Sequence, residues 1–151
     1  MKLNDHIFVA LFSLLFQFSF SQTETTQKKN TIFKIEMNLS AIGVESDDFP
    51  SIDAMIDFKL DSNICIKTFF NPAFDNQIYY LTNEQIEAVK SLLENTDLGQ
   101  FKEEYTVPVS DQPTSTTKIA TSDKTYVIRD YGLKGDETLT KLYQLVYRIN
   151  E

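Results

Sequence analysis

The clearest alternation of apolar and polar residues runs over residues 33–40. Its apolar positions are Phe33, Ile35, Met37 and Leu39, and its polar positions are Lys34, Glu36, Asn38 and Ser40. A period of two over eight residues predicts a strand with one buried and one solvated face. A second alternation over 54–61, the turn-forming residues Asp61-Ser62-Asn63 and a third β pattern over 64–70 together predict a hairpin.

The third β pattern carries apolar residues on both of its faces. Ile64, Ile66 and Phe70 share one face, and Cys65 and Phe69 share the other. This pattern predicts a more central strand, or a strand that is covered on both sides.

Further along the chain, residues 78–81 give a weaker signal of a short strand. Residues 116–120 and 125–130 predict a second hairpin that turns at Ser122-Asp123.

Two segments have helical signals. Thr82-Asn83-Glu84-Gln85 fits a capping box, in which the Thr hydroxyl and the Gln amide each satisfy a free backbone N–H. The apolar positions that follow predict a helix that ends near Asn95. The last helix is predicted to begin after Asp136, with Glu137 near its start and Arg148 near its end, as the helix dipole favours.

These elements follow in the order β-β-β-(β)-α-β-β-α, without a repeat or an internal linker. The order predicts a single α+β domain, in which an antiparallel sheet of four to five strands is covered on one face by two helices.

The first residues have the features of an export signal. Lys2 precedes an apolar run over residues 7–16, which is too short to span a bilayer, and Ser19 and Ser21 supply small residues before Gln22. We therefore predict a signal peptide over 1–21, a flexible leader over 22–30 and a folded domain over 31–151. The expected location is periplasmic or secreted, without stable membrane insertion after cleavage. An uncleaved N-terminal anchor is the alternative.

The composition of the chain excludes several kinds of catalytic and metal-binding site. The chain has 151 residues and a net charge of −8, which disfavours nucleic acid as a partner. The single histidine, His6, falls in the predicted signal, and Cys65 is the only cysteine. Ser-His-Asp and Cys-His nucleophile pairs are thereby excluded from the mature chain, as are an intramolecular disulfide and His-bearing zinc sites. Cys65 is interpreted as a buried thiol, with an intermolecular disulfide as the alternative.

We therefore predict no catalytic, cofactor-binding or metal-binding residue. The densest acidic cluster lacks the EF-hand spacing and is interpreted as a solvated loop. Its members are Glu45, Asp47, Asp48 and Asp53.

One segment has features beyond an ordinary loop, and its candidate interaction or architectural residues are Tyr105, Asp111, Pro113 and Thr114. Pro113 restricts the preceding residue to extended geometry, and Asp111 is placed to accept backbone N–H groups at the entry to the next strand. In the other interpretation, Tyr105 and Asp111 are exposed together and bind a partner.

The chain resembles a family of small, mostly secreted or lipid-anchored bacterial domains of unknown function. The resemblance rests on Leu81-Thr82-Asn83-Glu84-Gln85, on Tyr105 followed by Asp111-Gln112-Pro113-Thr114, and on the late strand Tyr126-Val127-Ile128-Arg129-Asp130-Tyr131-Gly132. It covers about residues 31–150. The family's Gly-x-Cys-Pro-x-Tyr segment is altered here, because Phe49-Pro50 stands where the family has Cys-Pro. The resemblance implies the fold and the compartment, but no activity.

These observations favour an exported, non-catalytic domain that acts as a protein-interaction or cell-envelope binding module, whose partner is an unknown protein or envelope component. The alternative is a carboxylate-dependent hydrolase of envelope polymers. It would need two acids, such as Asp111 and Asp130, about 5 to 9.5 Å apart. A purely structural or stress-related envelope component is a third possibility.

Overall fold

The structure is a computed structural model that describes residues 30–44 and 48–149. The predicted signal over 1–21, most of the predicted leader, and Glu45 and Asp47 of the acidic cluster lie outside the described residues. Within the described part of the chain, every helix is too short or too polar to cross a membrane.

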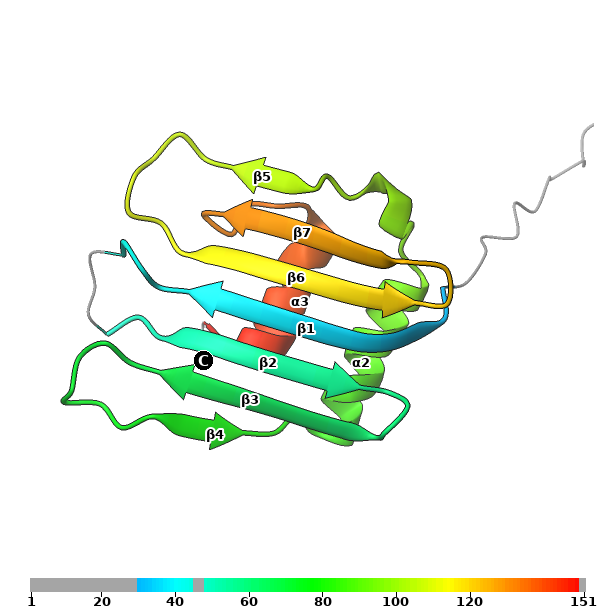
Figure 1. The fold of residues 1–151 in the computed structure, drawn as a ribbon, viewed down its shortest axis with the longest axis horizontal. Coiled ribbons are helices and arrows are strands. Elements are labelled where there is room, and N and C mark those ends of the chain that lie inside the picture. Colours follow the sequence, from blue (N-terminus) through cyan, green and yellow to red (C-terminus); the bar gives the residue numbers. More distant parts are fainter. Residues whose placement is uncertain (1–29, 45–47, 150–151) are drawn as a thin grey trace, which may run out of the picture.

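Seven strands form one sheet (Figure 1), in the spatial order β4-β3-β2-β1-β6-β7-β5. The strands are β1 (Ile32–Ser40), β2 (Ser51–Asp57), β3 (Ser62–Thr68), β4 (Gln77–Tyr79), β5 (Glu104–Thr106), β6 (Thr114–Thr121) and β7 (Thr125–Tyr131). Neighbouring strands are antiparallel except β5 and β7, which are parallel. The regular alternation of β1 therefore belongs to the strand at the centre of the sheet.

The predicted antiparallel sheet of four to five strands is wrong. The sheet is mixed and has seven strands, and the chain order is β-β-β-β-α-β-β-β-α. The strand missing from the prediction is β5, which is only three residues long and therefore too short for an alternation to be recognised. It forms by pairing beside β7, where the Arg129 N–H donates to the Glu103 carbonyl over 2.8 Å.

Helices α2 (Asn83–Glu94) and α3 (Glu137–Tyr147) both lie behind the sheet in Figure 1 and contact each other. A short 3-10 turn, η2 (Leu98–Gln100), follows α2. The capping box of α2 is confirmed, since the Gln85 N–H donates to the Thr82 hydroxyl over 3.3 Å and the Thr82 N–H donates to the Gln85 side chain over 3.0 Å. Asp136 caps α3, and its carboxylate accepts the Leu139 N–H over 2.9 Å.

The capping box leads to a first prediction. Thr82→Ala should lower the free energy of unfolding by about 1 kcal/mol, because the N–H of Gln85 loses its acceptor. Urea denaturation of the variant and the wild type measures the difference. Thr82→Ser, which keeps the hydroxyl, is the matched control, and equal stability of all three proteins would contradict the prediction.

The hydrophobic core lies between the sheet and the two helices. Its fully buried side chains come from both helices and from several strands, and they include Ile35, Leu39, Ile52, Leu93, Ile119 and Leu142. No element of the described part of the chain covers the opposite face, which we call the open face. The alternation of β1 and β2 thus separates residues of the core from residues of the open face.

The position of β3 corrects the interpretation of its two apolar faces. This strand is second from the edge of the sheet, and only the face that bears Cys65 points into the core. Ile66, on the other face, is 37% exposed, and its neighbour Ile78 on β4 is 62% exposed. A sequence pattern typical of a covered strand therefore lies on a sheet face that the described chain leaves uncovered.

Candidate functional site

The segment from Tyr105 to Thr114 connects β5 to β6, and its candidate residues do not share one environment. Tyr105 is half-buried on β5 and packs against the core, and its hydroxyl accepts the Lys102 N–H over 3.2 Å. The Pro113 carbonyl accepts the Gly132 N–H over 2.8 Å. Thr114 begins β6 and pairs with Tyr131. These three residues have positions within the framework of the sheet.

Asp111 differs from the other three. Its side chain is exposed, its φ is 57°, and no hydrogen bond to its carboxylate is present in the described part of the chain. The arrangement expected for Asp111, a carboxylate that accepts backbone N–H groups, occurs instead at Asp130. The two acids are also unlike in burial, since Asp130 is fully buried on β7. The buried Asp130 carboxylate therefore does not share a solvent-accessible site with Asp111.

Asp130 joins the end of β7 to helix α3. Its carboxylate accepts the Lys134 N–H over 3.1 Å, the Gly135 N–H over 2.9 Å and the Tyr143 hydroxyl over 3.1 Å. Burial and the adjacent Asp130 carboxylate raise the pKa of Tyr143, so this hydroxyl stays protonated and donates. Close by, the hydroxyls of Ser115 and Tyr147 form a buried hydrogen bond of 2.8 Å. This buried network has no solvent access and holds the helix against the sheet.

Cys65 is fully buried, which confirms the interpretation of a buried thiol. Burial raises the pKa of the Cys65 thiol, and hydrogen bonding to Tyr79 opposes that effect only in part. A neutral, buried thiol is a poor nucleophile and cannot reach another molecule while the domain is folded.

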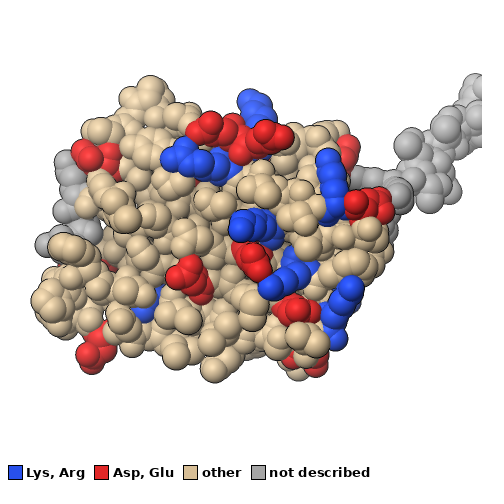
Figure 2. Space-filling view, viewed as in Figure 1, with Lys and Arg blue, Asp and Glu red and all other residues tan. Residues whose placement is uncertain are grey.

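The open face has a charged half and an apolar half. On the charged half, Lys34 on β1 binds Glu36 over 2.6 Å, and Lys118 on β6 lies 4.0 Å from the same carboxylate. At the β5 edge, Arg129 and Glu104 form an ion pair of 2.6 Å. Figure 2 shows side chains of both charge signs close together toward the centre, top and right of the face. Lys34, Glu36, Arg129 and Glu104 therefore each have an oppositely charged neighbour on this half.

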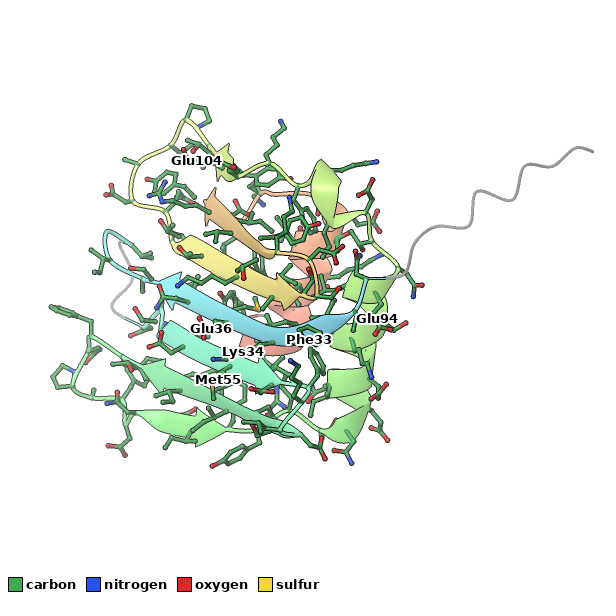
Figure 3. The ribbon with its side chains drawn as sticks, turned by 45° about the vertical axis from the view of Figure 1, so that its right-hand side comes forward. Phe33, Lys34, Glu36, Met55, Glu94 and Glu104 are labelled. Atoms are coloured by element: carbon green, nitrogen blue, oxygen red, sulfur yellow. The ribbon has the colours of Figure 1, made fainter. Side chains whose placement is uncertain are left out.

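The apolar half lies over β2, β3 and β4, where Figure 2 shows a largely uncharged surface in the lower part of the view. Its members are Met55, Ile64, Ile66 and Ile78, which we call the apolar row. Met55 is 36% exposed and lies beside Lys34 and Glu36 (Figure 3). Register places Met55 opposite Ile64 and Ile66 opposite Ile78, so the row is continuous across three strands.

A shallow depression of about 520 Å³ lies where the two halves meet. Glu36, Asp53, Lys118 and the apolar residues Met55 and Ile66 line it. The hydrogen bond from Lys34 holds the pKa of Glu36 below its usual range, and Asn38 donates to the Asp53 carboxylate over 2.7 Å. A general acid needs the opposite, a carboxyl group whose pKa is raised. Glu36 is therefore arranged to stay ionised and paired, and not to transfer a proton.

A further feature is the distribution of side chains that can bind a metal ion. Within residues 30–44 and 48–149, no three side chains of the His, Cys, Asp and Glu types come together as a set of metal ligands.

Sequence reasoning missed both the apolar row and the role of Asp130. The signal for the apolar row is the presence of apolar residues on both faces of residues 64–70. From the sequence alone, this pattern is interpreted as a more central strand or a strand that is covered on both sides. The signal for Asp130 is its position in the alternation of β7. It lies two residues after the buried Ile128, so both side chains point to the inward face of the strand.

A comparison with known families gives one match. A domain of unknown function, DUF6438, matches residues 62–150, which is more than half of the chain and runs from β3 to the end of α3. Strands β1 and β2, and the Phe49-Pro50 segment for which the sequence resemblance implied a Cys-Pro motif, lie outside the matched range. No curated protein and no solved structure matches the chain. The chain belongs to the DUF6438 family.

Proposed function

We propose that this protein is an exported, non-catalytic binding module, and that the open face of its sheet contacts a protein or another component of the cell envelope. The observation that carries the proposal is the apolar row. Met55, Ile66 and Ile78 are each exposed by a third or more on a face that the described chain leaves uncovered. Single exposed apolar side chains are common, but a continuous row across three strands is typical of a contact surface.

The charges of the open face favour the same function. An isolated charge costs free energy when a partner excludes water from it, whereas a charge that already has its counter-ion costs less. Lys34, Glu36 and Lys118 form one such group, and Arg129 and Glu104 form another. A partner that covers this face can therefore leave the Lys34–Glu36 and Arg129–Glu104 pairs intact at the interface.

Export rests on the predicted signal peptide over residues 1–21. The intact mass of the protein recovered outside the cytoplasm tests this part of the proposal, and a chain that begins at Gln22 is expected. The hydrolase alternative receives no support from the pairing and lowered pKa of Glu36.

The proposal is tested by photo-crosslinking from defined positions. A benzophenone amino acid at Ile66 on the open face should capture a partner from an envelope extract, and the same group at Gln144, exposed on α3, should not. The captured partner is then purified and titrated. Ile66→Lys should weaken its binding by about tenfold or more, because a charge replaces a buried apolar contact. Gln144→Lys, which introduces the same charge on the helix side, should leave binding unchanged.

Equal effects of the two lysine substitutions would contradict the proposal, as would capture from Gln144 alone. Circular dichroism of both variants shows whether each remains folded.

A further inference from the structure

A second apolar surface lies away from the apolar row, at the end of the sheet where the β1–β2 and β3–β4 connections meet (Figure 1). It is a pocket of about 420 Å³. Its apolar lining comes from both connections and includes Ile42, Val44, Phe49, Phe69 and Phe70. Phe49, which precedes Pro50, belongs to the β1–β2 connection.

The aromatic side of the pocket is held in place by the β3–β4 connection. The rings of Phe69 and Phe74 pack with their centroids 5.4 Å apart. The Phe74 N–H donates to the Asn71 carbonyl over 3.1 Å, and the Phe69 N–H donates to the Asn76 side chain over 3.3 Å. With this turn fixed, Phe70 projects outward and is 87% exposed. Ile42, on the facing connection, is 89% exposed. Two large apolar side chains thus stand in water at the mouth of one pocket.

The charge around the pocket has one sign. The described residues of the two connections, 41–44, 48–50 and 69–76, include Asp48 and Asp75 but no lysine or arginine. Asp48 also joins the two connections, because its carboxylate accepts the Asn71 side chain over 3.5 Å. The nearest lysine in the sequence, Lys67, places its ammonium over the Tyr79 ring, 5.3 Å from the ring centre. The pocket is therefore lined by apolar residues, and the charged residues that the structure describes in its two connections are both acidic; we call Asp48 and Asp75 the acidic rim.

We propose that this pocket binds a positively charged segment of a partner protein, with one large apolar side chain of that segment inserted between Ile42 and Phe70. The apolar lining provides the contact area, and the acidic rim selects basic residues on either side of the anchor. The net charge of −8 attracts a basic partner from a distance and repels an acidic one. The same charge opposes docking on an anionic lipid surface. This site is separate from the open face and does not depend on the function proposed above.

Fluorescence anisotropy with three labelled peptides tests the proposal on the full purified protein. One peptide has a Phe-Leu pair flanked by lysines, one has the same pair flanked by glutamates, and one has a Ser-Ser pair flanked by lysines. The first should bind at least about tenfold more tightly than either of the others, because only it supplies both the anchor and the positive charge. Its affinity should fall as salt is added.

Variants then locate the binding. Phe70→Ser should weaken the lysine-flanked Phe-Leu peptide by about tenfold. Asp48→Asn combined with Asp75→Asn should weaken it and reduce its salt dependence. Leu60→Ser is the matched control, because Leu60 is 75% exposed in the turn between β2 and β3, at the opposite end of the sheet.

Three outcomes would overturn the proposal: equal binding of the lysine- and glutamate-flanked peptides, equal effects of Phe70→Ser and Leu60→Ser, or failure of all three peptides to bind. The last result, together with Phe70-dependent binding to phosphatidylcholine vesicles, would assign the pocket to a neutral lipid surface instead.

Discussion

Replacing Asp130 with alanine is expected to lower the free energy of unfolding by about 3 to 5 kcal/mol. The substitution removes a buried carboxylate acceptor and leaves three donors without a partner: the N–H groups of Lys134 and Gly135 and the hydroxyl of Tyr143. Each hydrogen bond to a charged group contributes about 1.5 to 3 kcal/mol, and a buried donor that loses its acceptor carries a desolvation cost. Such a loss is a large fraction of the stability of an ordinary domain.

The structure supplies an independent sign that this position is constrained. A Cβ atom on Gly135 would lie 2.7 Å from the Asp130 carboxylate, so the loop can approach the acid this closely only with glycine there. The close approach at Gly135 and the three hydrogen bonds to Asp130 therefore belong to the same tightly packed junction between β7 and α3.

Asp111→Ala is the matched control for Asp130→Ala. Both variants remove one carboxylate, but Asp111 is exposed and its carboxylate has no hydrogen bond within the described residues. Its loss should change the free energy of unfolding by no more than about 1 kcal/mol, the backbone cost of placing alanine at a φ of 57° included. Urea denaturation measures both variants. Similar effects of the two substitutions would contradict the assignment of Asp130 as the buried acceptor.

The elements that could be predicted from the sequence are those whose signal is local. The alternation of β1 depends on its own residues, because each side chain lies on one of two faces. The capping box at Thr82 and the cap at Asp136 are likewise complete within four residues. The second hairpin also has its signal in adjacent residues, and β6 and β7 pair as its two strands.

The features that could not be predicted depend on residues far apart in the chain. Strand β5 exists because Glu104–Thr106 meets β7, whose residues come 25 positions later, and three residues are too few to show a period. The same holds for Asp130, whose burial is tolerated only because α3 brings Tyr143 to it. The local sequence pattern likewise does not show whether the second apolar face of β3 is covered by another part of the chain or stays exposed and available to a partner. The structure leaves Ile66 uncovered, and this difference is the basis of the proposed binding surface.

Tyr147→Ala is expected to lower the free energy of unfolding by about 3 to 5 kcal/mol, as other large-to-small aromatic substitutions in protein cores do. Tyr147 is fully buried, stacks on Tyr143 at a centroid distance of 5.6 Å, and shares a hydrogen bond with Ser115 on β6. Its loss creates a cavity between α3 and the sheet and also leaves the buried Ser115 hydroxyl unpaired.

Two further variants separate the ring of Tyr147 from its hydroxyl. Tyr147→Phe keeps the ring and removes only the hydrogen bond, so it should cost about 1 kcal/mol. Adding Ser115→Ala to Tyr147→Phe should cost less than the sum of the two single changes, because the pair then leaves no unpaired hydroxyl. Tyr80→Ala is the exposed control, since this side chain is 61% exposed and should contribute less than about 0.5 kcal/mol. Urea denaturation of all the variants measures these differences. A loss for Tyr147→Ala no larger than that for Tyr80→Ala would show that α3 does not pack on the sheet through Tyr147.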